Sequence, residues 1–346
     1  MYNQKMFGSS KKRVAINGFG RIGRLFLRQA FLNKEIEIVA INDLADIEDL
    51  AYLLRHDTVY RDFGFSVSVD GQNLVVDGKK IVVLQEKDPA LLPWGTMNVD
   101  VAVECTGLFE SFEKASVHVA AAGAKHVVIS APAKDAEGLA GGKTILMGIN
   151  DETLKNCSVS SNGSCTTNAT APIVHVLNEA VGISKAMLST VHAYTATQSL
   201  TDSPAKGKDF RRGRAAAQNI VPSTTGAAVS VTRAITDLQG KFDGIAIRVP
   251  VITGSLIDLT FVAKKKTSVE EINNAFVAAA SSSNWKGILG VTKDQPVSSD
   301  MIGMNCAVIV DLEYTKVVDG DLVKVLAWYD NEWGYVTTLI SHVLSV

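Results

Sequence analysis

The chain has 346 residues, of which 47% are hydrophobic and 20% are charged, and its formal net charge is -2. This length suggests two globular domains of about 100–200 residues each. The near-neutral charge argues against a dedicated nucleic-acid or membrane-surface binder, and no run of about 20 apolar residues is available to span a membrane.

The N-terminal region begins with a polar segment and continues into a βαβ pattern. Residues 1–12 lack the apolar core of a signal peptide, so we interpret them as a disordered tail of a cytoplasmic protein. A short apolar strand over residues 13–17 leads through a glycine-rich turn into a helix predicted over residues 21–32. The β-branched run over residues 36–41 predicts a second strand, which completes the βαβ unit.

The rest of the first half predicts further strands and helices. A helix is expected over residues 47–55, and alternating residues with Asp-Gly turns predict an antiparallel meander between residues 65 and 84. Continuous apolar runs predict buried strands over residues 99–103 and 126–129, joined by an alanine-rich helix over residues 112–122. These segments predict an α/β domain of the Rossmann type over residues 13–164.

The second half has long strands with few intervening helices. This pattern predicts an α+β catalytic domain over residues 165–332, with a mostly antiparallel sheet and helices on one face. Residues 333–346 are expected to pack back onto the first domain. The strands are predicted over residues 187–194, 245–251, 255–263, 307–311 and 322–328, and the helices over residues 170–179, 269–280 and 334–344.

The glycine-rich turn has the spacing of a dinucleotide-binding site. Gly18 permits a tight turn, Gly20 lets the backbone approach a pyrophosphate, and a third glycine allows close packing of helix on strand. The amides of Arg21 and Ile22 are expected to point at the phosphates from a helix N-terminus. Asp43 ends the second strand, where a carboxylate accepts hydrogen bonds from the adenosine ribose. NAD is therefore the expected cofactor, and a ligand-free turn with an aspartate helix cap is the alternative.

Cys165 is the candidate nucleophile. It lies among Ser, Thr, Asn and Gly before a predicted helix, whose amide dipoles favour a thiolate, whereas the other three cysteines lie in apolar or strand-like stretches. A nucleophilic thiol needs a base, and His192, in a strand with hydroxyl neighbours, is the best candidate among six histidines. The alternative for His192 is a buried structural role. His118 and His126 are interpreted as surface or packing residues.

A thiolate beside NAD predicts a specific reaction. The thiolate attacks an aldehyde to give a hemithioacetal, a hydride leaves to NAD, and a thioester remains for transfer to phosphate. A thiol hydrolase needs no dinucleotide fold, so the combination of the two motifs disfavours hydrolysis.

Four segments match the pattern of a known family. They are Ile16-Asn-Gly-Phe-Gly-Arg-Ile-Gly-Arg24, Ser164-Cys-Thr-Thr-Asn168, Thr190-Val-His-Ala-Tyr-Thr-Ala-Thr-Gln198 and Trp328-Tyr-Asp-Asn-Glu-Trp-Gly-Tyr335. With these segments the chain resembles the phosphorylating glyceraldehyde-3-phosphate dehydrogenases from Arg13 to Val346. The resemblance implies NAD-dependent oxidation of D-glyceraldehyde 3-phosphate to 1,3-bisphosphoglycerate with inorganic phosphate, a step of glycolysis and gluconeogenesis, by a homotetramer. The Ser-Cys-Thr-Thr-Asn segment is highly specific, and all the matching segments occur in family order.

The resemblance also implies a role for each matching residue. Cys165 would be the nucleophile, and His192 would activate it and act as general acid or base during hydride transfer. One phosphate site would comprise Ser164, Thr166, Thr225 and Gly226, and the other Thr195, Thr197 and Arg248, with Arg212 as a further contact. The cofactor would be lined by Arg21, Ile22, Asp43, Lys87, Ser130 and Asn331, with Tyr335 nearby. No metal ligands are predicted.

Several residues depart from the family pattern. Lys87 stands where many relatives have arginine, Ala169 replaces a second cysteine, and Gly163 replaces a usual alanine, which is expected to loosen the turn beside the nucleophile. The segment from Asp202 to Phe210 also differs from the commoner pattern. In the family this loop crosses a subunit interface near the adenosine ribose, so it bears on the choice between NAD and NADP.

Two other functions fit part of the pattern. Erythrose-4-phosphate dehydrogenases share the Cys-Thr-Thr-Asn segment, but they generally carry a different segment after the catalytic histidine, so residues 193–197 favour the glyceraldehyde enzyme. A non-catalytic relative that binds NAD or RNA is disfavoured because Cys165, His192, Thr195 and Arg248 are all present.

Overall fold

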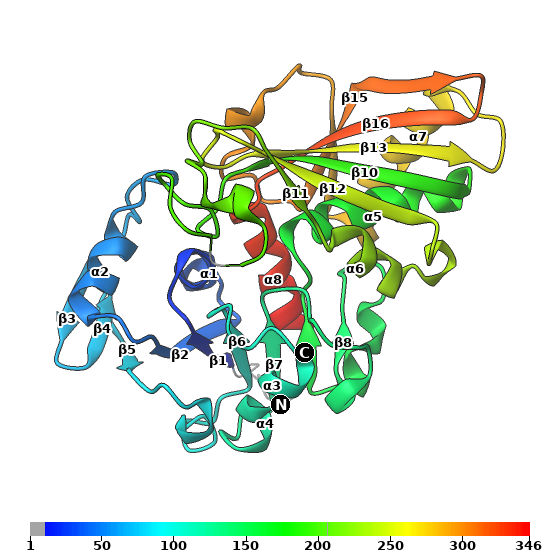
Figure 1. Ribbon diagram of the computed structural model, residues 1–346. Coiled ribbons are helices and arrows are strands. Elements are labelled where there is room, and N and C mark those ends of the chain that lie inside the picture. The colour runs from blue at the N-terminus through cyan, green and yellow to red at the C-terminus, as the bar shows by residue number, and fades with distance from the viewer. Residues whose placement is uncertain (1–10, 206) are drawn as a thin grey trace, which may run out of the picture.

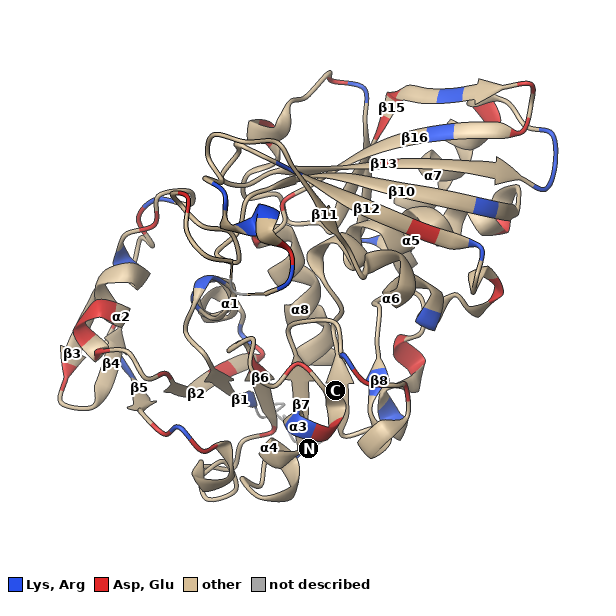
Figure 2. Cartoon of the chain, viewed as in Figure 1, with Lys and Arg blue, Asp and Glu red and all other residues tan. Residues whose placement is uncertain are grey.

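The computed structural model describes residues 11–205 and 207–346, and two sheets organise this part of the chain (Figure 1). The predicted tail is outside the described residues over positions 1–10, as is Lys206, whereas Lys12 already belongs to the first strand. The predicted fold class is confirmed: one sheet is largely parallel, as in Rossmann-type domains, and the other is mostly antiparallel. Basic and acidic residues are interspersed over the chain (Figure 2).

The first sheet has the strand order β3-β4-β5-β2-β1-β6-β7-β9-β8, and it is parallel from β5 to β8. Both of its faces are buried, since Val14 packs in a core with α1 and α8, whereas Ala15 packs on the opposite side with Phe112. This explains why these strands are continuous apolar runs. The strands are β1 (Lys12–Asn17), β2 (Ile36–Asn42), β3 (Val67–Asp70), β4 (Asn73–Val76), β5 (Lys79–Leu84), β6 (Val101–Glu104), β7 (His126–Ile129), β8 (Lys143–Thr144) and β9 (Val159–Ser161), and the helices are α1 (Arg21–Leu32), α2 (Ile47–Arg55), α3 (Phe112–Ala115) and α4 (Val117–Ala120).

The alanine-rich helix predicted over residues 112–122 is wrong as a single element. It is divided into α3 and α4 at Ser116, whose hydroxyl donates to the carbonyl of Glu113 at 2.7 Å. A serine that bonds to its own turn competes with the helical backbone. His118 in α4 is fully buried and its Nε2 lies 3.0 Å from the carboxylate of Glu104, so it is a packing residue and not a surface residue.

The second sheet has the strand order β11-β12-β10-β13-β16-β15-β14. β12 is parallel to β10 and β14 to β15, while the other neighbours are antiparallel. Its helices share a hydrophobic core with one face of the sheet, and two of them, α5 (Cys165–Ala180) and α6 (Ala227–Ala234), lie below it in Figure 1. The strands are β10 (Ile183–Ala193), β11 (Val221–Thr224), β12 (Phe242–Val249), β13 (Ser255–Ala263), β14 (Leu289–Thr292), β15 (Val308–Val318) and β16 (Leu322–Tyr329), and the helices are α5 (Cys165–Ala180), α6 (Ala227–Ala234) and α7 (Val269–Ala280).

The C-terminal helix α8 (Trp333–Ser345) follows the second sheet but packs with the first. Its residues Val336, Leu339 and Val343 belong to the core that also contains α1 and β1. All strands of the first sheet precede Cys165 and all strands of the second follow it. The domain boundary at residues 164 and 165 stays a prediction. Of the helices described, none combines the length and apolar character needed to cross a membrane.

Two buried histidines join β7, β9 and α8. The hydroxyl oxygen of Ser160 lies 2.7 Å from Nε2 of His126 and 2.8 Å from Nε2 of His342. The Nδ1 atom of His342 lies 3.0 Å from the side-chain oxygen of Asn162, which precedes the turn of the candidate nucleophile. Burial lowers the pKa of His126 to about 4 and the pKa of His342 to about 3. Both rings are therefore neutral at neutral pH, as hydrogen-bonded packing residues.

We expect this pair of histidines to make the protein sensitive to acid. The unfolded chain protonates both imidazoles below about pH 6.5, whereas the folded protein resists protonation until the pH falls through the lowered folded-state pKa values. Each histidine should therefore lower the free energy of unfolding by about 1.4 kcal/mol for every pH unit below about pH 6.5. Urea unfolding between about pH 7 and pH 4 measures the slope, which should be smaller in His342→Leu by about one proton. The exposed His56→Gln is the matched control, and equal slopes in wild type and His342→Leu would contradict this origin.

Candidate active site

Cys165 is the first residue of α5, and a hydrogen-bonded turn positions it. The hydroxyl of Ser164 caps the helix by accepting from the amide of Thr167 at 3.0 Å. Gly163 has a φ of 67°, a left-handed conformation that glycine adopts at little cost. The carbonyl of Gly163 accepts a hydrogen bond from the hydroxyl of Tyr335 at 3.0 Å. The sulfur therefore lies at a helix N-terminus that the local sequence and α8 both hold in place.

His192 lies beside this sulfur, near the end of β10. Its Nε2 atom is 3.4 Å from Sγ of Cys165, although 27 residues separate the two in the chain. The side chain is almost wholly buried, with 3% of its surface exposed. A thiol and an imidazole at this distance form the nucleophile and base arrangement of covalent catalysis. The structure thus brings together the two residues that the sequence singled out.

Arg248 occupies the other side of the His192 ring. It lies on β12, which pairs with β10 in a register that places Arg248 directly opposite His192. Its Nη1 atom is 2.7 Å from Nδ1 of His192 and 3.1 Å from the carbonyl oxygen of Ala193. The predicted phosphate-binding arginine therefore contacts the candidate base directly.

Burial dominates the electrostatics of the Cys165–His192 pair. It raises the pKa of the Cys165 thiol, and the positive charge of Arg248 and hydrogen bonds involving Thr166 only partly oppose this effect. Burial, and then the charge of Arg248, lower the pKa of His192 to about 3. Burial therefore opposes the charged form of both groups. This effect of burial opposes the thiolate that the helix N-terminus is expected to favour.

Tyr329 is a site residue that the sequence analysis missed. Its hydroxyl lies 3.0 Å from Oγ1 of Thr166 and 2.8 Å from Oγ1 of Thr190, and its ring is 5.9 Å from the ring of His192. Burial raises the pKa of Tyr329 well above its ordinary value, so it stays a neutral hydroxyl. The sequence signal for Tyr329 was its position two residues before Asn331, within a segment that matches the family pattern. It orients Thr166, one of the predicted phosphate contacts.

The remaining predicted phosphate residues form two groups. Thr195 and Thr197 have their hydroxyl oxygens 2.9 Å apart, and Arg212 donates to Thr197 at 3.0 Å. Thr225 and Gly226 immediately precede α6, and the Thr225 hydroxyl accepts from the amide of Ala227 at 3.2 Å. Within the described part of the chain, no hydrogen bond joins this second group to Cys165, so its contribution to a phosphate site beside the thiol remains a prediction.

A pocket of about 340 Å³ covers the glycine-rich turn. Gly18 has a φ of 93°, and a side chain there would approach the backbone of Thr106 within 2.6 Å. At Gly20, in contrast, a Cβ atom would meet nothing within 4 Å, so the backbone is open to a ligand. This combination fits a pyrophosphate lying against the turn. The pocket is lined by Asn17, Gly18, Gly20, Asn42, Asp43, Leu44, Glu86, Lys87, Pro89, Cys105, Thr106, Leu108 and Phe109.

Asp43 and Asn331 are held in fixed orientations. The carboxylate of Asp43 accepts from the amides of Phe19 at 2.7 Å and Ala45 at 2.9 Å, while Asp46 provides the side-chain cap of α2. The alternative reading of Asp43 as the helix cap is therefore wrong. The side-chain oxygen of Asn331 accepts from the amide of Gly254 at 3.1 Å and from the hydroxyl of Ser255 at 2.9 Å. That orientation keeps its NH₂ group for other acceptors.

The other predicted cofactor contacts differ in whether they line the pocket or bind other residues of the chain. Lys87 lines the pocket, whereas the Arg21 side chain binds Glu332 through Nε at 2.9 Å and also pairs with Asp57. Arg21 can thus offer its backbone amide, as predicted, while its guanidinium ties α1 to the segment after β16. Ser130 is half-buried, and its amide donates to the carbonyl of Glu104 at 2.9 Å. Contacts of these residues with a cofactor remain predictions.

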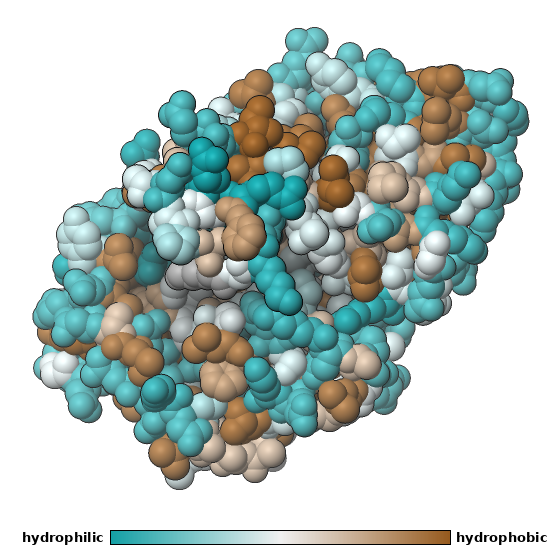
Figure 3. Space-filling view, viewed as in Figure 1, coloured by the Kyte–Doolittle hydropathy of each residue, from teal (hydrophilic) through white to brown (hydrophobic). Residues whose placement is uncertain are grey.

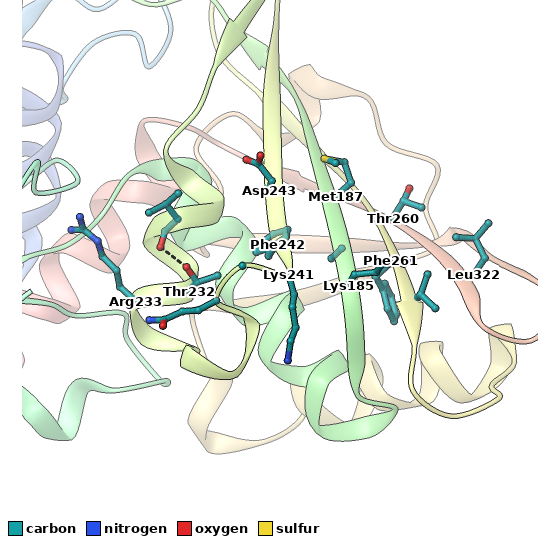
Figure 4. Close-up of a pocket in the computed structure, with 15 residues that line it drawn as sticks. Lys185, Met187, Thr232, Arg233, Lys241, Phe242, Asp243, Thr260, Phe261 and Leu322 are labelled. Atoms are coloured by element: carbon teal, nitrogen blue, oxygen red, sulfur yellow. Dashed lines mark hydrogen bonds between the residues drawn. The ribbon is translucent and has the colours of Figure 1, made fainter. Parts of the chain in front are cut away.

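Another pocket lies away from these residues. It has a volume of about 870 Å³ and is formed by α6, the loop before β12, and β10, β12 and β13, with Leu322 at the start of β16 (Figure 4). None of the predicted site residues lines it. Its walls are mainly apolar side chains and lysine stems, without a nucleophile and base pair. The candidate nucleophile and base therefore lie outside this pocket.

Comparisons with known proteins agree with this geometry. Residues 12–112 match a family model described as the NAD binding domain of glyceraldehyde 3-phosphate dehydrogenase, and residues 164–331 match the model of its C-terminal domain. The chain is 48% identical over 332 residues to glyceraldehyde-3-phosphate dehydrogenase of Streptomyces coelicolor, which covers 95% of this chain and 96% of the relative. The enzyme of Geobacillus stearothermophilus is 47% identical over 338 residues, covering 96% of this chain and 98% of the relative. Glyceraldehyde-3-phosphate dehydrogenase B of Aspergillus oryzae is 45% identical over 338 residues with the same coverage. The chain therefore belongs to the glyceraldehyde-3-phosphate dehydrogenase family.

Proposed function

We propose that this protein oxidises D-glyceraldehyde 3-phosphate to 1,3-bisphosphoglycerate, with NAD as the cofactor and inorganic phosphate as the second substrate. The observation that carries this function is the 3.4 Å approach of Cys165 Sγ to His192 Nε2 in a chain that also forms a dinucleotide-binding turn. The family assignment supports the same reaction and does not favour erythrose 4-phosphate as the substrate.

The residues of the site supply the nucleophile, the proton transfers and the phosphate contacts. Sγ of Cys165 attacks the aldehyde carbon, and the thiol proton passes through His192 to the aldehyde oxygen, which gives a hemithioacetal. His192 then accepts the hydroxyl proton as a hydride leaves, and a thioester remains on Cys165. Bound NAD supplies the hydride acceptor. Inorganic phosphate attacks the thioester carbon, and the departing sulfur recovers a proton from His192.

The phosphate groups of the substrates require local positive charge, because the net charge of the chain is -2. Arg248 and Arg212 are the guanidinium groups of one predicted site, and Thr195 and Thr197 add hydroxyls. Guanidinium groups and hydroxyls suit a phosphate dianion, since both donate hydrogen bonds. We assign this cluster to one phosphate, and the group containing Ser164, Thr166, Thr225 and Gly226 to the other.

The direct test compares two aldehydes in one assay. NADH formation should be phosphate-dependent, and it should be faster with D-glyceraldehyde 3-phosphate than with erythrose 4-phosphate at equal concentration. Faster turnover of erythrose 4-phosphate would reverse the substrate assignment. Binding of NAD without turnover of either aldehyde would instead support the non-catalytic alternative.

Replacing Arg248 with Ala should weaken the use of phosphorylated substrate much more than the use of free glyceraldehyde. Loss of a charge-assisted contact costs about 1.5–3 kcal/mol, which corresponds to a decrease of about 10- to 150-fold in kcat/KM. Steady-state kinetics with both aldehydes measure the difference. Arg211→Ala, which removes an exposed arginine that pairs with Asp209 and is not a predicted phosphate contact, is the matched control. Equal losses for the two aldehydes would point to misfolding or to a different role for Arg248.

Cofactor choice should follow from Asp43. Its carboxylate is fixed at the edge of the pocket, where it favours a ribose hydroxyl and repels the 2′-phosphate of NADP. The Ser203 hydroxyl, a candidate donor to that phosphate, donates to Ser199 at 2.7 Å within this chain. Lys206, a second candidate, is outside the described residues, and Lys208 is exposed.

We therefore expect kcat/KM to favour NAD over NADP by at least about tenfold, which corresponds to about 1.4 kcal/mol. Asp43→Ala should reduce this preference, because it weakens the binding of NAD and removes the repulsion of the 2′-phosphate of NADP. Asp49→Ala, which removes an equal charge at an exposed position, should leave the preference unchanged. Steady-state kinetics with both cofactors check this. Equal or better efficiency of wild type with NADP would show that Asp43 does not decide the cofactor.

We also propose that the protein is a cytoplasmic homotetramer. Large apolar side chains of the segment from residue 200 to 220 support self-association, because Phe210 is 82% exposed and Leu200 is 77% exposed. On the face shown in Figure 3, hydrophobic residues form separate groups between hydrophilic ones. Light scattering after size-exclusion chromatography measures the mass, and a monomer would contradict the proposal.

A further inference from the structure

A buried carboxylate contacts two of the residues that line the pocket over the glycine-rich turn. Glu104 is the last residue of β6, and only 2% of its surface is exposed. Its Oε2 atom accepts a hydrogen bond from the side-chain amide of Asn17 at 2.6 Å and lies 3.0 Å from Nε2 of His118. Its Oε1 atom accepts from the backbone amide of Thr106 at 2.7 Å and also from the hydroxyl of that residue. Hydrogen bonds therefore replace water around this carboxylate.

His118 presents a fixed donor to this carboxylate. The indole Nε1 of Trp94, which can only donate, lies 3.2 Å from Nδ1 of His118. Nδ1 must therefore carry the lone pair, so the ring proton lies on Nε2 and points at Glu104. The ring also packs edge-to-face on Phe109, with the centroids 6.1 Å apart, and Phe109 lines the pocket. His118 thus does more than fill space, because it orients the carboxylate and supports one wall of the pocket.

Glu104 begins a row of polar side chains across the carboxyl ends of three strands. β6, β1 and β2 are neighbours in the first sheet (Figure 1), and the register places Asn17 opposite both Glu104 and Asn42. A carboxylate can only accept, so the NH₂ group of Asn17 faces Glu104 and its oxygen faces Asn42. The NH₂ group of Asn42 donates to that oxygen at 2.7 Å, and the oxygen of Asn42 accepts from the backbone amide of Glu86 at 2.8 Å. The NH₂ groups of the row are therefore turned toward Glu104.

This amide row adjoins the residues that are predicted to contact the adenosine half of NAD. Asn42 directly precedes Asp43, the predicted partner of the adenosine ribose, and Asn17 directly precedes Gly18. A Cβ atom at Gly18 would lie 2.6 Å from the amide nitrogen of Thr106, so the turn packs on a residue that the buried carboxylate holds. Contacts that are formed before a ligand arrives reduce the cost of ordering the site on binding.

We propose that Glu104 and His118 are positioning residues of the cofactor site, which fix the orientation of the amide row and so preorganise the pocket for the adenosine half of NAD. This inference rests on the proposed function, because it takes Asp43 as the contact of the adenosine ribose. Neither Glu104 nor His118 lines the pocket, so both act through the side chains that do. A glutamine at position 104 would present its NH₂ group either to the amide of Thr106 or to Asn17 and His118, all of which are donors.

Calorimetric titration with NAD and with ADP-ribose, which lacks the nicotinamide, tests the proposal without turnover. Glu104→Gln should weaken both ligands by the same factor, about tenfold, as expected for loss of a hydrogen bond to a charged group. Glu113→Gln, which removes an equal charge at an exposed position of α3, should bind both ligands as wild type does. Unchanged affinity of Glu104→Gln, or a loss confined to NAD, would overturn the proposal.

Two replacements of His118 separate positioning from packing. His118→Phe keeps a ring against Phe109 but removes the donor to Glu104, so it should also weaken NAD and ADP-ribose by about tenfold. His118→Gln keeps a donor near the position of Nε2 and should recover most of the affinity. Equal affinities of the two variants would show that the donor has no role, which would overturn the proposal. These variants leave the carboxylate in place, so they test the proposal even if Glu104→Gln does not fold.

Two further readouts separate a local effect on the cofactor site from general damage. In Glu104→Gln, KM for NAD should rise with the dissociation constant, and kcat should fall by a smaller factor than KM rises. Alkylation of Cys165 by iodoacetamide in the cofactor-free variant should keep the wild-type rate, since Cys165 does not line the pocket. Losses of the same size in affinity, kcat and alkylation would overturn the proposal. Absence of NAD binding by the wild-type protein would instead remove the proposed function, so the two failures are distinguishable.

Discussion

Replacing Cys165 with Ser is expected to abolish aldehyde oxidation, with a decrease in kcat of roughly 10⁴-fold or more, as for loss of a covalent nucleophile. A serine hydroxyl has a far higher pKa than a thiol and cannot attack as a thiolate does. The measurement is NADH formation under saturating substrate.

The same variant should bind NAD almost as tightly as wild type, because Cys165 is not among the residues that line the pocket over the glycine-rich turn. Isothermal titration with NAD is the control for folding. Cys157→Ser is the matched variant, since it replaces a half-buried thiol outside the site and should leave oxidation at the wild-type rate. If Cys165→Ser lost no more than about tenfold of the wild-type rate, the thioester mechanism would be ruled out.

The second large effect is expected for His192→Gln, which should lower the rate of hydride transfer by about 10²- to 10⁴-fold, the usual contribution of a general base. Glutamine keeps some of the volume and hydrogen bonding of the ring but cannot exchange a proton at this pH. In the wild type, Nε2 of His192 lies 3.4 Å from Sγ of Cys165, where it can accept the thiol proton and the hemithioacetal proton. The variant has no such acceptor at this position. Single-turnover formation of NADH by stopped flow measures this step.

The pH dependence separates a chemical role of His192 from a packing role. In His192→Gln the residual rate should rise with pH, because hydroxide and solvent replace the base and a larger fraction of the raised-pKa thiol ionises. His126→Gln is the matched control, since it alters a buried histidine that lies outside the site. A variant of His192 that lost activity to the same extent as His126→Gln, with an unchanged pH profile, would indicate a structural role.

Local patterns in the sequence were sufficient for much of the fold. The helices α1 and α2 have the predicted bounds, because apolar spacing and the following strand starts are encoded within each segment. In contrast, β8, β9, β11, β14 and α6 were not predicted, since they are short and their stability comes from neighbouring strands and helices. The division of α3 from α4 at Ser116 was also not predicted. The high alanine content of the segment predicts one helix, and the side-chain hydrogen bond of Ser116 that interrupts it is not apparent from composition.

The candidate site shows the same division. Cys165 was found from its polar neighbours, and the glycine-rich turn from its spacing, because both signals are continuous in the chain. His192 was found only by elimination among six histidines, since its partner lies 27 residues away. Tyr329 was missed because nothing local marks a buried tyrosine at the end of a strand as a partner of two distant threonines.

The sequence by itself determined the family, the glycine-rich turn, the candidate nucleophile and the type of each domain, because these properties reside in short motifs and in local periodicity. Only the tertiary structure decided that Arg248 lies against Nδ1 of His192, through the parallel register of β10 with β12. It also decided that Cys165 is buried, which raises the pKa of its thiol against the effect expected from the helix N-terminus. Both outcomes depend on strand pairing and desolvation across the folded chain, and no stretch of sequence carries either quantity.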